Sequence, residues 1–467
     1  MRVRLFGQYV HVSIAALAAV EAVIFFGAML LAYRLRFGTW YPEAVITAKD
    51  ALLPCAAVFG TANLISVLAF GLYSSRQRSR TSGVFVRLVA AIAAAGVVTA
   101  AVFYVVPSLF LGRGVLGLSS FFSLIGAALS RGVFSRVMDE SLFKRRVLVY
   151  GVGQRTAAIL SLRRRSDRRG FEIVGFVQPD GESATVPPDR VLEASAGILE
   201  LCSRLDVHEI VVAMEDRRRG FPILGLLECR LAGMEVTELL TFLERETGRV
   251  RIDVLNPSWM IFGDGFRRDP LRLLSSRVLD LVASVVLVAL SLPVMLLTIM
   301  AIKLEDGWRA PIFYGQARVG LGGQTFTVLK FRSMRTDAER DGQAQWAQKS
   351  DPRVTRVGAV IRKLRIDELP QILNVLAGHM SFVGPRPERP QFVAELSQKI
   401  PYYVQRHCVK PGITGWAQLC YPYGSSEQDA LEKLQYDLYY IKNNTLLFDL
   451  AILVQTAEVV FMGKGAR

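Results

Sequence analysis

The stretch Arg365-Ile-Asp-Glu-Leu-Pro-Gln-Ile-Leu-Asn-Val-Leu-Ala-Gly-His-Met-Ser-Phe-Val-Gly-Pro-Arg-Pro-Glu388 contains two adjacent carboxylates, Asp367 and Glu368. Apolar residues with helical spacing follow them, at Leu369, Ile372, Leu373 and Leu376. This spacing predicts that the pair begins a helix with a buried apolar face. Arg386 stands further on between two prolines. Carboxylates that attack or bind a metal, and rigidly held bases that bind phosphate, are what phosphoryl transfer requires.

The simpler interpretation of this acid pair is structural. Asp367 would cap the helix and Glu368 would complement its dipole, and the pair by itself favours this interpretation. A helix N-terminus also binds anions, however. Mg²⁺ usually takes one or two protein carboxylates and completes its shell with water and substrate phosphate. We therefore keep Asp367 and Glu368 as candidate catalytic residues and candidate metal ligands.

Basic residues are frequent around the acid pair. The candidates for binding the phosphates of a diphosphate are Arg386, Lys330, Arg332, Arg318, Arg353 and Arg356. Arginine makes forked contacts to phosphate, and lysine supplies a point charge. So many bases near one acid pair would be unusual for a solvated surface, and they indicate a diphosphate pocket.

Composition points to a membrane protein that handles phosphates. The chain has 467 residues, a formal net charge of +15 and 51% hydrophobic residues. Its length suffices for two or three domains. Excess base suits an anionic membrane surface or phosphorylated substrates, and with long apolar runs present we expect no nucleic acid as a partner. The five cysteines form no CxxC pair, which argues against a zinc site and a disulfide framework.

Four apolar segments predict a helical transmembrane region over residues 1–143. They are Val12–Tyr33, Ala51–Tyr73, Val84–Val106 and Val115–Phe134. Each is near the ~20 residues that a membrane-spanning helix needs, and a buried helical core is the alternative. Arg76, Arg78 and Arg80 lie between the second and third segments, and further bases follow the fourth. The positive-inside rule puts both regions, and everything after Lys144, in the cytoplasm.

Residues 144–257 are expected to form a Rossmann-like α/β domain. Arg146–Thr156 reads as a strand, a glycine turn and a helix. The further strands and helix are expected at Glu172–Val177, Glu209–Ala213 and Pro222–Ala232. Gly151 and Gly153 match the first two positions of a dinucleotide turn, but Thr156 replaces the third glycine. The domain is therefore either a nucleotide site or, as we favour, a structural or regulatory element.

A fifth apolar segment, residues 281–302, follows a basic and aromatic linker at 258–273. It is long enough to cross a membrane, but the sequence Ser291-Leu-Pro293 lies at its middle, and proline kinks a helix. A kinked span and a helix that enters and returns on the cytoplasmic side are both compatible with this pattern. A crossing would put the acid pair outside, away from nucleotide-activated substrates. We therefore expect a re-entrant helix hinged at Ser291 and Pro293.

The motifs of residues 274–467 resemble the bacterial sugar transferase family, the polyprenyl-phosphate hexose-1-phosphate transferases. These motifs are Lys330–Met334, Asp367–Gln371, Asn374-Val-Leu, Met380-Ser, Gly384–Glu388, Lys410–Gln418, Tyr436–Tyr440 and Phe448-Asp-Leu450. Four spans and a nucleotide-binding-like domain ahead of them resemble the larger members, which initiate exopolysaccharide or O-antigen repeat units. One departure is Arg365, where many relatives carry Ser or Thr.

The resemblance implies a monotopic α/β catalytic domain over 274–467, on the cytoplasmic face of a bacterial inner membrane. It implies that Asp367 attacks the β-phosphate of a UDP-sugar, releases UMP and passes the sugar phosphate to polyprenyl (undecaprenyl) phosphate. Glu368 would hold Mg²⁺, and Arg386 would clamp phosphate. Relatives of this size also suggest a homodimer. Which sugar is transferred depends on the shape of the pocket, which sequence periodicity does not give.

Two other functions stay open. Gly151 and Gly153 suit a membrane-anchored nucleotide-sugar dehydratase or epimerase, although the chain has no Tyr-x-x-x-Lys acid–base pair. A change in cofactor absorbance with NAD(P) would identify such an enzyme. The third function is a non-enzymatic scaffold for polysaccharide export, in which the four spans bind partners. It requires that Mg²⁺, UDP-sugars and polyprenyl phosphate give no product.

Overall fold

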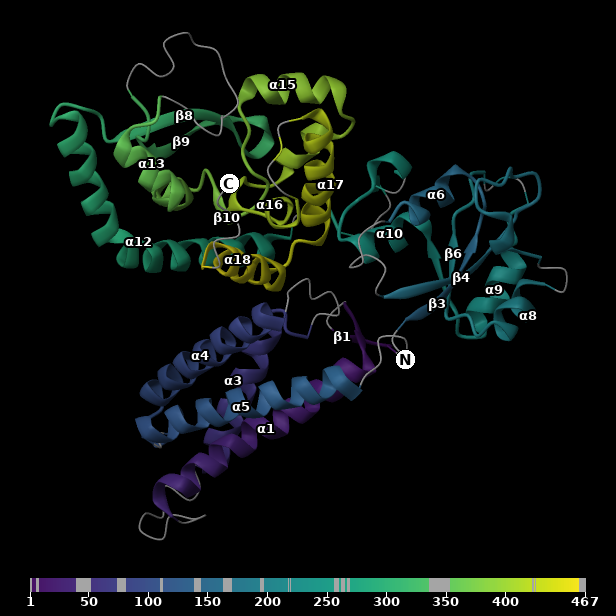
Figure 1. The fold of residues 1–467 in the computed structure, drawn as a ribbon, viewed down its shortest axis with the longest axis horizontal. Coiled ribbons are helices and arrows are strands. Elements are labelled where there is room, and N and C mark those ends of the chain that lie inside the picture. The colour runs from purple at the N-terminus through teal and green to yellow at the C-terminus, as the bar shows by residue number, and fades with distance from the viewer. Residues whose placement is uncertain are drawn as a thin grey trace. The chain divides into compact units, whose positions relative to one another are not determined.

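A computed structural model describes residues 2–5, 8–38, 52–73, 81–109, 112–137, 144–162, 170–193, 197–216, 218, 220–255, 260–261, 265–266, 269–335, 353–421, 424 and 426–461. Two compact units make up the chain, Met1–Thr247 and Gly248–Arg467, and each is described by itself (Figure 1). The division lies ahead of the expected domain end at residue 257. Val250 packs in the core of the second unit, and its amide donates to the Gln435 carbonyl at 3.0 Å.

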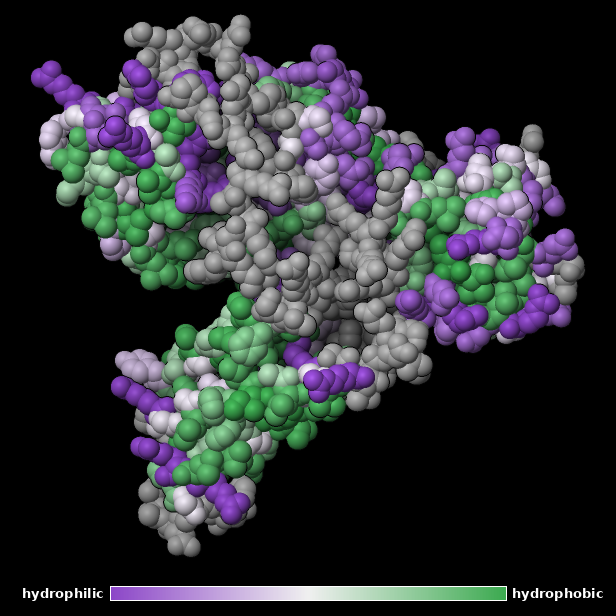
Figure 2. Space-filling model, in the orientation of Figure 1, coloured by the Kyte–Doolittle hydropathy of each residue, from purple (hydrophilic) through white to green (hydrophobic). Residues whose placement is uncertain are grey.

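The first unit contains the four expected apolar helices. They are α1 (Val12–Phe37), α3 (Leu52–Ala69), α4 (Thr81–Val105) and α5 (Arg113–Val137). The hairpin β1 (Arg2–Leu5) and β2 (Gln8–His11) precedes them, and the 3₁₀ turn η1 (Pro107–Leu109) follows α4. Helices α1 and α4 each pack against α3 and α5. All four are long and apolar enough to cross a membrane, and Figure 2 shows hydrophobic residues over their surface.

A buried ion pair fixes two of these helices. Glu21 of α1 is fully buried and lies 2.7 Å from Arg131 of α5, and the Tyr73 hydroxyl donates to the same carboxylate. A charge in an apolar bundle needs such a partner. Arg76, Arg78 and Arg80, which carry part of the predicted orientation, lie outside the described residues.

The expected α/β domain is a five-stranded parallel sheet in the order β5-β4-β3-β6-β7. Its strands are β3 (Arg145–Tyr150), β4 (Phe171–Val177), β5 (Val191–Leu192), β6 (Glu209–Val212) and β7 (Glu235–Glu238). Its helices are α6 (Gln154–Leu160), η3 (Pro188–Arg190), α8 (Ile198–Arg204), α9 (Ile223–Leu231) and α10 (Leu239–Thr247). The order, which runs outward from β3 on both sides, is that of a doubly wound fold.

Helix α12 (Pro270–Asp306) carries the fifth apolar segment of the chain. Its 37 residues span about 55 Å, more than the ~30 Å hydrocarbon core of a bilayer. Pro293 lies inside the helix, and the Ser291 hydroxyl donates to the Leu287 carbonyl at 2.6 Å. Both features bend helices, and Figure 1 shows α12 bent along its length.

Side chains near both ends of α12 bind the rest of the second unit. Near the N-terminal end, buried Asp280 accepts hydrogen bonds from the Ser381 hydroxyl at 2.9 Å and the Phe382 amide at 3.0 Å. At the C-terminal end, Asp306 pairs with Arg332. Between these anchors most of the apolar side chains of α12 are exposed, so the helix offers an apolar surface that the unit does not cover.

The remaining elements of the second unit form a small α/β assembly. Strands β8 (Phe313–Val319) and β9 (Thr325–Phe331), joined by η5 (Leu321–Gly323), form an antiparallel hairpin. Strands β10 (Ser381–Val383) and β11 (Gly412–Thr414) pair in parallel. The helices are η4 (Ile252–Val254), α13 (Arg356–Lys363), η6 (Ile366–Glu368), α14 (Gln371–Leu376), α15 (Pro390–Lys399), η7 (Tyr403–Cys408), α16 (Trp416–Cys420), α17 (Glu427–Asn443) and α18 (Leu446–Phe461). One core, which includes Val375, Phe382 and Leu438, joins α14, β10 and α17.

Candidate active site

The acid pair lies in a 3₁₀ turn and not at the start of the following α-helix. Asp367 and Glu368 belong to η6, whose N-cap is Arg365, and Pro370 is the N-cap of α14. Neither helix start has a capping side-chain hydrogen bond. The helix-cap interpretation of Asp367 is therefore wrong. Leu373, expected on a buried face, is also 43% exposed.

Three bases from different segments meet one oxygen of Glu368. Its Oε1 lies 3.6 Å from Lys330 Nζ, 3.6 Å from Arg386 Nη2 and 3.8 Å from Arg365 Nη1. Lys330 comes from β9, Arg386 from the turn after β10, and Arg365 from the residue before η6. The hairpin, the turn and η6 thus place a carboxylate among bases that can also bind phosphate.

The two carboxyl groups have different electrostatics. Burial and then the charge of Glu368 raise the pKa of Asp367 above its ordinary value, against the opposing effects of Lys330 and Arg362. Burial would also raise the pKa of Glu368, but Arg386 and Lys330 outweigh it and lower that pKa. Arg362 on α13, five residues before Asp367, is one of the bases near the acid pair in the sequence, but it was not among the six candidate phosphate ligands.

The turn that carries Arg386 is held through its backbone. The Arg386 carbonyl accepts a hydrogen bond from Arg406 Nη2 at 3.0 Å, and the Pro387 carbonyl accepts one from Arg318 Nη1 at 3.1 Å. The Val319 amide donates to the Glu388 carbonyl at 3.0 Å. Arg318, a candidate phosphate ligand, therefore contacts the backbone beside Arg386.

The other candidate bases have different surroundings. Arg332 is 7% exposed and pairs with Asp306 at the end of α12, so its side chain stabilises the helix attachment. The Arg353 carbonyl accepts from the Arg335 amide at 2.9 Å. The Arg356 amide donates to Glu305 at 2.8 Å at the start of α13. Of the six predicted phosphate ligands, Lys330 and Arg386 are the two whose ion pairs reach the acid pair among the described contacts.

A Mg²⁺ ion fits the donor chemistry of the acid pair. Within the described residues, no group of three or more His, Cys, Asp or Glu could hold a metal ion. Asp367 and Glu368 supply two carboxylates, which is the number that Mg²⁺ takes when water and substrate phosphate complete its shell. A transition-metal or zinc centre, which needs more protein ligands, does not fit these residues.

A dinucleotide does not fit the glycine turn after β3 in this arrangement. The Gly153 amide donates to Glu182 Oε1 at 3.1 Å, and the Gln154 amide donates to Glu215 Oε1 at 2.6 Å. A Cβ on Gly153 would collide with both carboxylates. In a dinucleotide turn, these amides receive the pyrophosphate. Here these amides donate their hydrogen bonds to the chain's own carboxylates instead.

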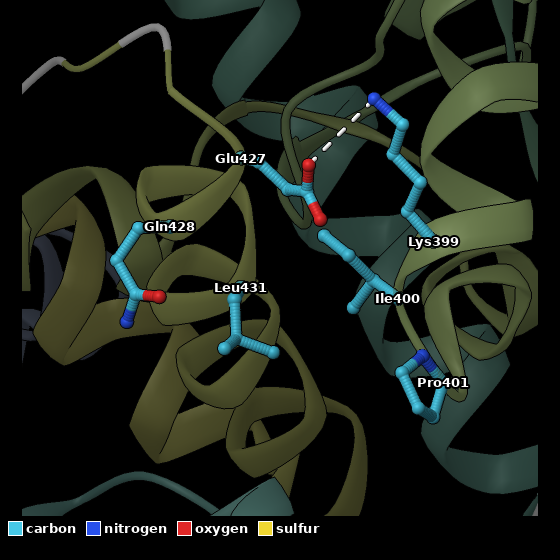
Figure 3. Close-up of a pocket in the computed structure, with 6 residues that line it drawn as sticks. All are labelled: Lys399, Ile400, Pro401, Glu427, Gln428 and Leu431. Atoms are coloured by element: carbon cyan, nitrogen blue, oxygen red, sulfur yellow. Dashed lines mark ion pairs between the residues drawn. The ribbon is translucent and has the colours of Figure 1, made fainter.

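A pocket of about 240 Å³ lies on another part of the second unit, between α15 and α17 (Figure 3). It is lined by Lys399, Ile400, Pro401, Glu427, Gln428 and Leu431. Lys399 pairs with Glu427 at 3.6 Å across it. Its lining includes none of the residues of the acid pair or of the bases around it.

Comparison with known proteins finds one family model and several relatives, all of them sugar transferases or sugar phosphotransferases. Residues 271–463 match the model of the bacterial sugar transferase family. A UDP-glucose:undecaprenyl-phosphate glucose-1-phosphate transferase of Xanthomonas campestris pv. campestris is 30% identical over 99% of this chain and 96% of its own length. A UDP-N-acetylgalactosamine-undecaprenyl-phosphate N-acetylgalactosaminephosphotransferase of Aeromonas hydrophila is 44% identical over 52% of this chain and 56% of its own length. An undecaprenyl-phosphate galactose phosphotransferase of Salmonella typhimurium is 28% identical over 74% of both chains.

Proposed function

The chain belongs to the bacterial sugar transferase family, and from this premise we propose that it transfers a sugar 1-phosphate from a UDP-sugar to undecaprenyl phosphate and releases UMP. The reactions named for the relatives support this proposal. The observation that carries it is the meeting of Lys330 and Arg386 at Glu368, beside Asp367, inside the matched region. By analogy with the large members of the family, the reaction begins an exopolysaccharide or O-antigen unit.

Asp367 is the nucleophile of a two-step displacement. Its carboxylate oxygen bonds to the β-phosphorus, the bond between that phosphorus and the bridging oxygen breaks, and UMP leaves with the electron pair. A phosphate oxygen of undecaprenyl phosphate then attacks the phosphosugar, and the bond to Asp367 breaks. Covalent catalysis of this kind divides one difficult step into two. Arg386 and Lys330 bind the diphosphate oxygens and orient the donor.

Glu368, with Asp367, would hold Mg²⁺. A bound Mg²⁺ ion supplies positive charge that stabilises the diphosphate. Glu368 suits this role because neighbouring bases lower its pKa and keep it ionised. Removal of divalent ions by EDTA should abolish UMP release, and added Mg²⁺ should restore it. Full activity in EDTA would contradict the role of the metal.

Helix α12 is re-entrant and keeps the active site on the cytoplasmic face. The attachment of both Asp280 and Asp306 to one compact unit supports this, because a helix that crossed a bilayer would hold its ends on opposite sides. The bend beside Pro293 lets the helix turn back. The apolar exposed middle would then lie in the inner leaflet.

A panel of UDP-sugars tests the function. The relatives named above act on N-acetylgalactosamine, glucose and galactose donors, so these three form the first panel. Purified protein should release about one equivalent of UMP without undecaprenyl phosphate, and should turn over repeatedly when the acceptor is added. The absence of UMP release from every donor would refute the proposal. A dehydratase or epimerase is disfavoured by Glu182 and Glu215 at the glycine turn.

A further inference from the structure

Arg406 and Asp437 form a buried ion pair behind the turn that carries Arg386. Arg406 lies in η7 and Asp437 in α17, and their residues are 6% and 2% exposed. Arg406 Nη2 lies 2.9 Å from Asp437 Oδ2 and donates to the Arg386 carbonyl at 3.0 Å. Arg406 Nη1 contacts the hydroxyl of buried Tyr403 at 2.8 Å. One guanidinium thus joins two helices to the backbone of a candidate phosphate ligand.

We propose that Arg406 and Asp437 are positioning residues, which fix the Pro385-Arg386-Pro387 turn and so direct the Arg386 guanidinium at the donor diphosphate. This proposal rests on the proposed function, in which Arg386 binds phosphate. Neither Arg406 nor Asp437 touches substrate, and their effect passes through the Arg386 backbone.

The local covalent geometry explains why one hydrogen bond can have this effect. The ring of Pro387 restricts Arg386 to extended backbone conformations, and Pro385 has a fixed φ of its own. The turn is therefore stiff. Its internal conformation is fixed by the prolines, but its position relative to Glu368 depends on contacts with the surrounding chain. Arg406 holds it on one side and Arg318 on the other. A shift of about 1 Å at a reacting group can cost ~10²-fold in rate.

A second buried pair in the same unit supplies a matched control. Arg272 of α12 pairs with Asp449 of α18, which is 1% exposed and accepts from the Tyr440 hydroxyl at 3.0 Å. Both pairs combine an arginine, a buried aspartate and a tyrosine. The Arg272–Asp449 pair, however, makes its backbone contact at the Asn444 carbonyl, at 3.3 Å, and not at Arg386.

Two double-mutant cycles test the proposal. Asp437→Asn and Asp449→Asn are each made in the wild-type chain and in an Arg386→Ala chain, and kcat/KM for UMP release and the melting temperature are measured in detergent. Asp437→Asn should lower kcat/KM at least about tenfold in the wild type and less than about twofold in the Arg386→Ala chain, since coupled residues are not additive. Asp449→Asn should lower kcat/KM by the same factor in the wild-type chain and in the Arg386→Ala chain. If Asp437→Asn lowered kcat/KM by the same factor in both backgrounds, the proposal would be overturned.

Arg406→Lys covers the case in which Asp437→Asn does not fold. Lysine keeps a charge opposite Asp437 but lacks the planar fork that serves two acceptors at once. The variant should melt near the wild-type temperature and lose at least about tenfold in kcat/KM, and wild-type activity would overturn the positioning role. A wild type that releases no UMP overturns the proposed function as well. If the wild type releases UMP but Asp437→Asn lowers kcat/KM by the same factor in both backgrounds, the positioning role of Arg406 and Asp437 is refuted and the proposed function stands.

Discussion

Asp367 and Glu368 are neighbours in η6, yet their pKa values move in opposite directions. That of Asp367 is raised by burial and by Glu368, whereas that of Glu368 is lowered because Arg386 and Lys330 outweigh its burial. Carboxyl groups whose pKa values are pushed apart take different roles in catalysis. Under the proposed function, Glu368 is the member that stays charged to lower pH, and Asp367 is the member whose ionisation sets the rate.

The pH dependence of UMP release should therefore follow Asp367. If Asp367 is the nucleophile, as proposed, its ionised carboxylate is the form that attacks, and the rate should rise with pH through the Asp367 pKa. Arg362 lowers that pKa, and we expect Arg362→Gln to raise it and to shift the acid limb of the pH–rate profile to higher pH. Lys363→Gln, at the exposed next residue, should leave the limb in place. If the acid limb of the pH–rate profile of Arg362→Gln stayed in place or moved to lower pH, the limb could not be assigned to Asp367.

If α12 is re-entrant, as proposed, the chain before it and the chain after it lie on the same side of the membrane. Leu231→Cys precedes the helix and Trp308→Cys follows it, and both positions are exposed. In a chain with Cys408 and Cys420 replaced by Ser, a membrane-impermeant maleimide should label both in inverted vesicles and neither in spheroplasts. Labelling of the two sites from opposite sides would mean that α12 crosses.

Arg365 has a left-handed backbone, with φ 60° and ψ 17°, immediately before the acid pair. Such a conformation costs a non-glycine residue about 1 kcal/mol, whereas glycine adopts it freely. Arg365→Gly should therefore melt at a higher temperature than Arg365→Ala. Both variants lose the contact to Glu368, so their UMP release should be similar. Equal melting temperatures would show that the backbone carries no strain.

His407 should make the second unit sensitive to acid. Burial, and then the charge of Arg406, lower the pKa of His407 to about 4. The unfolded chain, with a pKa near 6.5, binds the proton first as the pH falls. The unfolding free energy therefore drops between pH 6.5 and 4, by up to about 3 kcal/mol.

The melting temperature at pH 7 and pH 5 measures this effect. The difference should shrink in His407→Gln, because glutamine has no proton to bind in this range. His208→Gln, at an exposed position of the first unit, should keep the wild-type difference. A His407→Gln chain as acid-sensitive as the wild type would assign the loss to other groups.

Local pattern was sufficient to predict the long apolar helices and three central strands of the five-stranded sheet. The apolar runs of α1 and α12 and the alternation of strands and helices in the sheet follow from periodicity and turn residues. The acid pair is different. Its apolar spacing predicted one continuous helix, but the left-handed Arg365 and the N-cap Pro370 divide it into η6 and α14.

The partners of charged residues depend on distant parts of the chain. Arg332 pairs with Asp306, and Gly153 binds Glu182 through its amide. Sequence spacing gives no signal for either contact, because the two residues meet only when separate elements pack. The Arg406–Asp437 pair could not be predicted for the same reason. By contrast, Lys330 and Arg386 were candidates because of their motifs, and they do reach Glu368.

The most direct test of Asp367 as the nucleophile is the intact mass of the protein after incubation with its UDP-sugar and Mg²⁺, without undecaprenyl phosphate. We predict a gain of one phosphosugar, which disappears when the acceptor is added. Asp449→Asn, a buried aspartate outside the site, should retain this gain and Asp367→Asn should lack it. The same mass gain in Asp367→Asn, or UMP release from the wild type with no mass gain at all, would contradict covalent catalysis at Asp367.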